Sequence, residues 1–282
     1  MAAYAFNAGT NTEAVVTLFD AEIGLDPTEE TKIADWVATP HGVEKFGATL
    51  KLRKIPVFSS QTYTGSTTST RGFLTYNQNI QSTITVSATG RYSAVGIDRS
   101  FINQVINDGN YRTGFKTQLM GTLKEEVDSS LFALASSLST SESQADIDDA
   151  MVRTALGDLA TNAKGKFSEN AMKLLVVHPT ELKNVWNIPA IKEYQIRGTI
   201  GAAVNAKMNA YGLEWRESGK VLNSLGSKYN PLLLKEAWAL AWNEKPHILD
   251  VQIDGLTENF IGYAEYGVAE WFDAFGVALI TT

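Results

Sequence analysis

The chain has 282 residues, of which 44% are hydrophobic and 20% charged, and its formal net charge is −7. A chain of this length can build one large core or two modest domains. The absence of a long apolar run excludes a membrane span, the absence of cysteine excludes disulfides and thiolate metal sites, and acidity with scattered Lys and Arg argues against strong nucleic-acid binding.

Residues 1–30 contain six acidic residues and no basic one. Their apolar side chains follow no sustained period, which predicts an extended arm. In DPTEETKIADWV, Asp26 or Thr28 is a candidate cap for a short helix or turn. A frayed terminus is the alternative interpretation of this stretch.

Residues 46–97 are typical of β-structure, because KLRKIPVF and QSTITVSATGRYSAVGI alternate partially and are rich in β-branched residues. Between them lies SSQTYTGSTTSTRGF, residues 59–73. From Ile55 to Gly90, Arg71 is the only charged residue. Proteins normally protect exposed strand edges with charge. We therefore expect this uncharged stretch to pack on its own protein or on another copy.

Residues 110–138 carry the clearest helical pattern. Seven apolar residues, three or four positions apart, form one stripe: Phe115, Leu119, Leu123, Val127, Leu131, Leu134 and Leu138. The stripe predicts a helix about 40 Å long, at 1.5 Å per residue, whose apolar side faces a sheet.

An α/β segment is expected next. It comprises a helix near 145–163, a buried strand at 172–177, and a helix TELKNVWN that Thr180 can cap. The glycine-containing stretch 188–212 indicates irregular structure. The last third alternates and predicts strands in LEWRES, KEAWALAWN, HILDVQIDG, NFIGYAEYGVAEWF and FGVALITT. Together these elements predict an α+β protein.

The sequence contains no complete catalytic or metal-binding motif. The nucleophile elbow, the H-E-x-x-H motif and the phosphate loop are absent, and GTIGAA matches a dinucleotide fingerprint only loosely. DVQIDG begins like a calcium loop, but Ile261 stands where the bidentate Glu is required. Trp238 and Trp242 share one face and predict core packing, with a sugar platform as the alternative. We predict no catalytic, metal or cofactor site.

The order of the segments resembles the major capsid proteins of tailed bacteriophages, the Hong Kong 97 fold family. GATLKLRKIPVF…TYTG…FLTYNQNIQSTITV resembles the family's extended E-loop hairpin. IDRSFINQVINDGNYRTGFKTQLMGTLKEEVDSSLFALAS resembles its spine helix, and MKLLVVHPTELKNVWN is similar to a strand–helix unit of its axial domain. NFIGYAEYGVAEWFDAFGVALITT resembles its returning strands. The resemblance rests on arrangement and covers nearly the whole chain.

The resemblance implies an α+β, Hong Kong 97-like fold in five parts. These are an N-terminal arm (1–45), the E-loop hairpin (46–97), a peripheral domain with the spine helix (98–144), an axial domain (145–246) and returning peripheral-domain strands (247–282).

The function that the resemblance implies is that of a structural protein and not of an enzyme. Copies of the chain would assemble through hexamers and pentamers into an icosahedral shell that encloses double-stranded phage DNA. Assembly would take place in the host bacterial cytoplasm, and the protein would reside in the virion. Contacts between subunits would involve the E-loop tip, with Gln61, Tyr63, Thr64, Arg71 and Phe73, and the arm, with Phe6, Val15 and Phe19.

The remaining partners also follow from the resemblance. Some family members join subunits through an E-loop lysine, but no lysine lies between Lys54 and Lys116, so we expect a non-covalent shell. A portal, decoration proteins and a separate scaffolding protein are implied, the last because 282 residues leave no room for a long cleaved scaffolding segment. DNA would be contacted weakly and non-specifically, and no cofactor and no membrane are expected.

Three alternatives remain open on the sequence. An encapsulin-type compartment shell shares this fold and is distinguished by its cargo. An α/β enzyme with a β-flap lid lacks a recognisable catalytic constellation here. A phage tail or adhesin module is suggested by the Thr-rich β-stretches but not by the long helix.

Overall fold

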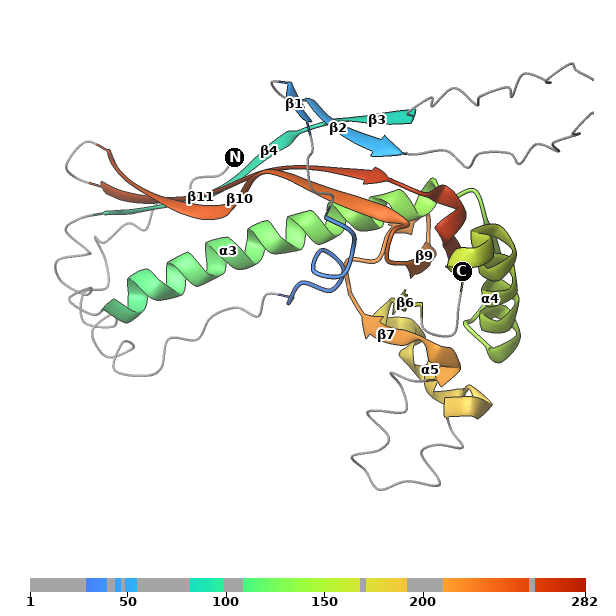
Figure 1. Ribbon diagram of the computed structural model, residues 1–282. Coiled ribbons are helices and arrows are strands. Elements are labelled where there is room, and N and C mark those ends of the chain that lie inside the picture. Colours follow the sequence, from blue (N-terminus) through green and yellow to red (C-terminus); the bar gives the residue numbers. More distant parts are fainter. Residues whose placement is uncertain are drawn as a thin grey trace, which may run out of the picture.

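The computed structural model describes residues 29–39, 44–46, 49–54, 82–98, 109–167, 171–191, 210–253 and 257–282. They form an elongated half, in which a long helix runs beneath a long hairpin, and an α/β half beside it (Figure 1).

The elongated half is built on a three-stranded antiparallel sheet in the order β10-β11-β4. Strands β10 (Trp238–Ile253) and β11 (Thr257–Glu270) form the hairpin, and β4 (Thr89–Asp98) pairs with β11. Helix α3 (Gly109–Phe132) lies along one face (Figure 1) and spans about 36 Å at 1.5 Å per residue. The register of β10 shifts twice, between Trp242 and Glu244 and between Glu244 and His247.

The apolar stripe of α3 faces this sheet. A Cβ at Gly262 would lie 3.0 Å from Leu123 Cδ1, so glycine permits the close approach of β11 to the helix. The helix ends at Phe132, six residues before its predicted end, and a 3₁₀ turn, η1 (Ala133–Ser136), follows. There, Ser136 Oγ and Ser137 Oγ donate to the Ala133 and Leu134 carbonyls and compete with helix continuation.

A second three-stranded antiparallel sheet consists of β1 (Glu44–Phe46), β2 (Thr49–Lys54) and β3 (Ser82–Ser87). It lies on the side of the long sheet opposite α3 (Figure 1). Val86 packs there in one cluster with three small residues of the hairpin, Ala239, Ala241 and Ala269.

The α/β half contains a six-stranded mixed sheet. Its main path is β5-β12-β9-β6-β7, and β8 pairs with β9. The strands are β5 (Ser141–Gln144), β6 (Lys173–Val177), β7 (Glu214–Glu217), β8 (Asn223–Ser224), β9 (Ser227–Leu234) and β12 (Gly276–Thr281). The helices are α4 (Asp149–Ala163), α5 (Leu182–Asn187) and the 3₁₀ turns η2 (Lys164–Lys166), η3 (Pro179–Glu181), η4 (Ala210–Gly212) and η5 (Asp273–Phe275).

Both faces of this sheet are buried at its central strands. Leu175 and Val177 of β6 pack in a cluster with α4, whereas Leu174 and Val176 pack in a cluster that includes α3. Strand β6 is therefore buried at all five positions, as is typical of a central strand covered on two sides.

Several predicted elements are confirmed and others need correction. The strand at 172–177 is present as β6, and a turn occupies residues 32–37. Helix α4 begins four residues later than predicted, because the Asp148 carboxylate caps it by accepting from Met151 N at 2.7 Å. Thr180 was the wrong cap: His178 is the N-cap residue of η3, and its Nδ1 accepts from Thr180 N.

The expected part boundaries do not follow the sheets. Strand β12, expected among the returning peripheral strands, pairs with β9 and β5 in the α/β sheet. Strand β10 begins at Trp238, inside the range expected for the axial domain. The reason is long-range pairing: Val277 and Leu279 complete an apolar face that Leu232 and Leu175 begin.

Candidate functional site

The residues predicted to contact other subunits lie outside the described residues. This applies to Gln61, Tyr63, Thr64, Arg71 and Phe73 of the E-loop and to Phe6, Val15 and Phe19 of the arm. What the structure describes is the point from which each of these two segments leaves the body.

The E-loop leaves from the end of the β2–β3 pair. Lys54 pairs with Ser82, and the antiparallel register continues back to Thr49 and Ser87. Val86, 9% exposed, fixes this pair on the small side chains of β10 and β11. The two ends of residues 55–81 are thereby held side by side on a buried support.

A cleft of about 360 Å³ opens where β3 and β4 separate from β11. Arg91, Ser130, Tyr266 and the hydroxyl-bearing residues Thr85, Ser87 and Thr89 are among its lining residues. Arg91 Nη2 lies 3.1 Å from Glu126 Oε1, and Tyr266 Oη lies 2.9 Å from Ser130 Oγ. The Arg91 guanidinium is already paired with the Glu126 carboxylate, so the cleft is poorly suited to binding an anion.

The arm leaves from a segment that we call the arm anchor, residues 29–38. On the side that faces α3, two carboxylates of that helix accept hydrogen bonds from the backbone of the anchor. Asp128 accepts hydrogen bonds from Lys32 N at 2.6 Å and Ala34 N at 2.9 Å, and Glu125 accepts from Glu29 N at 2.6 Å. Backbone N–H groups of the anchor are thus hydrogen-bonded to side chains that lie 94 to 96 positions away in the sequence.

On the other side, the arm anchor is held by β7 and the turn after it. Arg216 Nη1 donates to Lys32 O at 2.6 Å and to Asp35 Oδ1 at 2.7 Å. Gly219 N donates to Glu29 Oε1 at 3.2 Å. Since α3 belongs to the elongated half and β7 to the α/β half, the arm anchor ties the two halves together.

Burial and hydrogen bonding set the protonation of the two carboxylates in the anchor. Burial raises the pKa of Asp128 above its ordinary value, although three backbone N–H groups oppose the shift. Burial also acts to raise the pKa of Glu125, but hydrogen bonds from Glu29 N and Lys220 Nζ outweigh it, and the pKa is lowered. Ile33 and Trp36 add apolar contacts, because both are buried in the cluster shared with α3.

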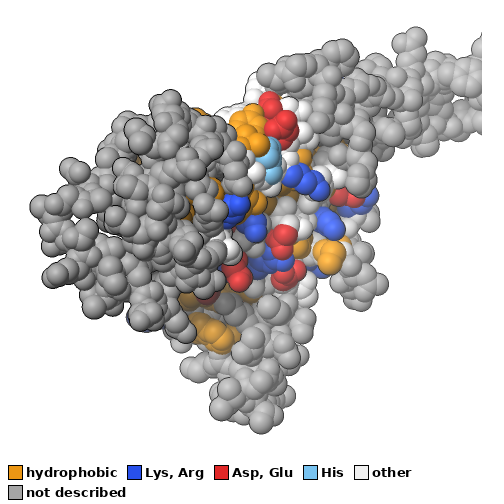
Figure 2. All heavy atoms as spheres, turned by 90° about the vertical axis from the view of Figure 1, so that its left-hand side faces the viewer, with side chains coloured by type: hydrophobic (Ala, Val, Ile, Leu, Met, Phe, Trp, Pro, Cys, Tyr) orange, Lys and Arg blue, Asp and Glu red, His pale blue; other side chains and the backbone are white. Residues whose placement is uncertain are grey.

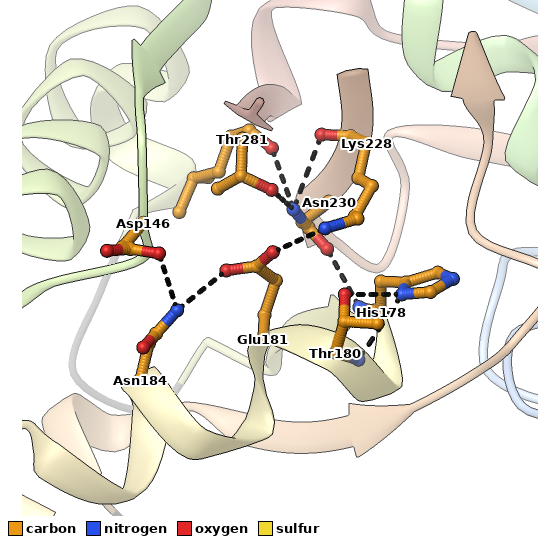
Figure 3. A network of polar contacts seen from close by, with 9 residues as sticks. Asp146, His178, Thr180, Glu181, Asn184, Lys228, Asn230 and Thr281 are labelled. Atoms are coloured by element: carbon orange, nitrogen blue, oxygen red, sulfur yellow. Dashed lines mark hydrogen bonds and ion pairs between the residues drawn. The ribbon is translucent and has the colours of Figure 1, made fainter. Parts of the chain in front are cut away.

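A polar network lies at the ends of the central strands of the α/β sheet, where η3 and α5 follow β6 (Figure 3). Glu181 is central: Lys228 Nζ donates to Oε1 at 2.9 Å and Asn184 Nδ2 to Oε2 at 3.2 Å. Burial acts to raise the Glu181 pKa, but these donors prevail and lower it. Asn230, fully buried, accepts from His178 N and donates to the Leu279 carbonyl. The network therefore joins β9, β12 and η3.

One face of the long sheet remains largely uncovered in its outer part. We call it the outer face, the side away from α3. Cross-strand pairing places Tyr92, His247 and Tyr263 together there, and Leu249 pairs with Ile261 beside them. Tyr92 is 59% exposed and Leu249 45%. Glu244 and Glu265 pair on the same face.

The predicted spine residues lie as follows. Leu119, Leu123, Val127 and Leu131 of α3 are buried, and Phe115 is half-buried. Leu134 lies in η1 and Leu138 beyond it, and both join the same cluster. Trp238 is fully buried, and Trp242 stacks edge-on against Tyr266 at 5.8 Å between ring centroids, which favours core packing over a sugar platform.

Sequence reasoning missed the residues of the arm anchor. Asp128 is one of several acidic residues of the helix and forms no motif, and Arg216 is one basic residue in a short strand. The only local signal for a buried segment was a pair of large apolar residues three positions apart, Ile33 and Trp36, directly after the acidic arm.

The residues that the structure describes contain no group of three or more His, Asp or Glu side chains that could hold a metal ion. Within the same part of the chain, no helix is both long and apolar enough to cross a membrane.

Comparison with known proteins identifies the fold. No family model matches the sequence, and no curated protein matches it. A capsid structure of the cyanophage P-SCSP1u superposes with a TM-score of 0.70 at 13% identity, covering 94% of this chain and 92% of that one. The capsid of Ralstonia phage GP4 gives 0.66 at 8% identity, covering 100% and 98%. A structure from Mycobacterium phage Che8 gives 0.65 at 12% identity, covering 92% and 94%.

The class that these matches define is the fold of phage capsid proteins. Nearly the whole length of the chain adopts this α+β, Hong Kong 97-like fold. The predicted fold class and the resemblance drawn from segment order are confirmed at that level.

Proposed function

We propose that this chain is a major capsid protein of a tailed bacteriophage, which assembles with itself through hexamers and pentamers into an icosahedral shell around double-stranded DNA. The observation that carries the proposal is the fold match over more than nine-tenths of both chains. The phage origin of the named neighbours favours a phage shell over a cellular compartment shell.

The E-loop is the first contact element of this proposal. Residues 55–81 leave from a supported strand pair, and a fixed base suits a segment that must reach a neighbour. We assign its landing site to the outer face of the adjacent copy. Exposed Tyr92 and Leu249 offer apolar contact there, and Glu244 and Glu265 offer carboxylates to Arg71, the only charge between Ile55 and Gly90.

The arm is the second contact element. Its apolar residues Phe6, Val15 and Phe19 would pack on a neighbouring copy and gain order on assembly. The arm anchor supports this role, because it holds Lys32, close to the point where residues 1–28 end, between α3 and β7.

The remaining assignments follow from the same proposal. The five sequence parts serve as arm, E-loop, peripheral and axial domains, with β12 counted to the axial sheet. The virion is the final location, after assembly in the host cytoplasm, with a portal, decoration proteins and a scaffolding protein as partners. Figure 2 shows Lys and Arg side chains interspersed with Asp and Glu on the described part of one face. This mixture and the net charge of −7 suit weak, non-specific contact with DNA.

Electron microscopy of the purified protein tests this function. We expect closed shells, or rings of five and six, at low salt with a crowding agent. A variant in which a short Gly-Ser linker replaces residues 59–73 should keep the wild-type melting temperature but stay monomeric. A wild-type protein that is monomeric under every condition, including co-expression with a phage scaffolding protein, contradicts the proposal.

The non-covalent character of the shell has its own test. Shells dissolved in hot detergent should give one band of monomer mass on a denaturing gel. A ladder of multimers would contradict this part of the proposal while leaving assembly itself intact.

A further inference from the structure

The turn between β8 and β9 has an unusual residue at its tip. Ser224 pairs with Ser227, so Leu225 and Gly226 form a two-residue hairpin loop. Their φ angles are 53° and 89°, both positive, as a type I′ turn requires. Asn-Gly is the preferred pair for this turn, because a leucine Cβ is crowded by the following carbonyl at positive φ.

Leu225 is also fully exposed. Its relative accessibility is 105%, whereas the other exposed large hydrophobic residues of the described chain range from 36% to 61%. A strained backbone and a solvated leucine both disfavour this residue in the isolated subunit. No contact within the described chain compensates for them.

The surroundings of Leu225 indicate which kind of partner it meets. Residues 221–227 carry no charge, and the flanking lysines are engaged: Lys220 with Glu125 at 3.0 Å and Lys228 with Glu181 at 2.9 Å. Nucleic acid would require free cations here. Two copies of a chain with net charge −7 repel one another least where they meet through uncharged surfaces.

The turn is carried by the α/β half. Strands β8 and β9, which it joins, belong to the α/β sheet, although Lys220 just before β8 pairs with Glu125 of α3 at 3.0 Å. A contact made at the tip of the turn would add to those proposed for the E-loop and the arm.

We infer that Leu225 is an intersubunit contact residue, which packs against the α/β half of a neighbouring copy of this chain. The inference rests on the proposed shell function and adds a third contact to it. Burial of one leucine side chain corresponds to about ten- to a hundredfold in an association constant.

The test uses substitutions that separate folding from assembly. Leu225→Asn supplies the residue that the turn prefers but removes the apolar side chain. The melting temperature of the subunit should stay unchanged or rise by up to about 3 °C, while the protein concentration needed for assembly, followed by light scattering, should rise at least about tenfold. Leu225→Met keeps an apolar side chain of similar volume and should assemble like the wild type.

The outcomes are distinct. A Leu225→Asn protein that assembles like the wild type overturns the inference and assigns the turn to some other partner, while the proposed function stands. A Leu225→Asn protein with a clearly lower melting temperature also overturns it, because the leucine would then stabilise the subunit itself. A wild-type protein that never assembles contradicts the proposed function instead.

Discussion

The two large sheets of this protein differ in how much of their surface the subunit covers. The central strands of the α/β sheet are buried on both faces, and β6 has no exposed position. The long sheet is covered by α3 on one face, but much of its outer face is open, and Tyr92 and Leu249 are exposed there. The α/β sheet therefore contributes most to the stability of the subunit, while the long hairpin leaves exposed the surface that the proposed shell would use for contacts between copies.

Truncation of leucine gives the largest expected contrast between the sheets. Leu232→Ala in β9 removes a side chain that is fully buried, and we expect a loss of about 2–5 kcal/mol in the free energy of unfolding. Leu249→Ala in β10, 45% exposed, should cost less than about 1 kcal/mol. Urea unfolding monitored by tryptophan fluorescence checks both. Equal losses would contradict the division of roles.

Two glycine substitutions refine the comparison within the α/β half. In Gly276→Ala the new Cβ would meet Leu138 Cδ2 at 2.7 Å and Leu233 Cδ2 at 3.1 Å, which should destabilise the protein by about 1–3 kcal/mol. Gly157, inside α4, has no atom within 4 Å of an added Cβ, so Gly157→Ala should stabilise by about 0.5–1 kcal/mol. Calorimetric melting would show shifts of opposite sign, and shifts of the same sign would refute this packing.

The connection between the halves is tested at the arm anchor. Asp128→Asn exchanges one carboxylate oxygen for an NH₂ group, so the side chain can accept from Lys32 N or from Ala34 N but not from both, at a cost of about 1–3 kcal/mol. Limited proteolysis should then cut near residues 29–38 sooner than in the wild type. Lys124→Gln, on the exposed side of the same helix, is the matched control and should leave the cleavage rate unchanged.

The smallest effect concerns pH and the polar network of Figure 3. The pKa of Glu181 is lowered from 4.5, so its ionised form adds stability above that value, and this stability is lost as pH falls through the folded-state pKa. Glu181→Gln should therefore be less stable than the wild type at pH 7, with a difference that shrinks below pH 4.5. Glu244→Gln, exposed on β10, serves as control. A constant difference from pH 7 to pH 3 would show that charge is not the cause.

The sequence pattern predicted those elements whose buried residues form a regular pattern within one short segment. The apolar stripe from Leu119 to Leu131 marks α3 because one helix face meets one sheet, and four consecutive apolar residues, Leu174 to Val177, mark β6 because both its faces are covered. Strand β9 was not predicted, and its Pro231 is a residue that argues against a strand interior. In the structure, Pro231 lies just outside the part of β9 that pairs with β6.

Features that depend on distant partners could not be predicted from the sequence. The hydrogen bond from Arg216 to Lys32 O spans 184 positions, and no local signal marks either residue. The sequence GVALIT predicts that β12 is a strand, but it does not indicate that the partners of this strand are β9 and β5 of the α/β sheet. Leu225 is inconspicuous in the sequence, because only its φ angle and exposure set it apart.

The position of β12 also has a consequence for synthesis on the ribosome. Strand β12 lies between β5 and β9, although it is made more than 40 residues after β9. Until the chain has been translated through Thr281, β5 and β9 have a vacant place between them, and Asn230 lacks the Leu279 carbonyl to which it donates. A nascent subunit therefore cannot complete its α/β sheet before β12 has been made.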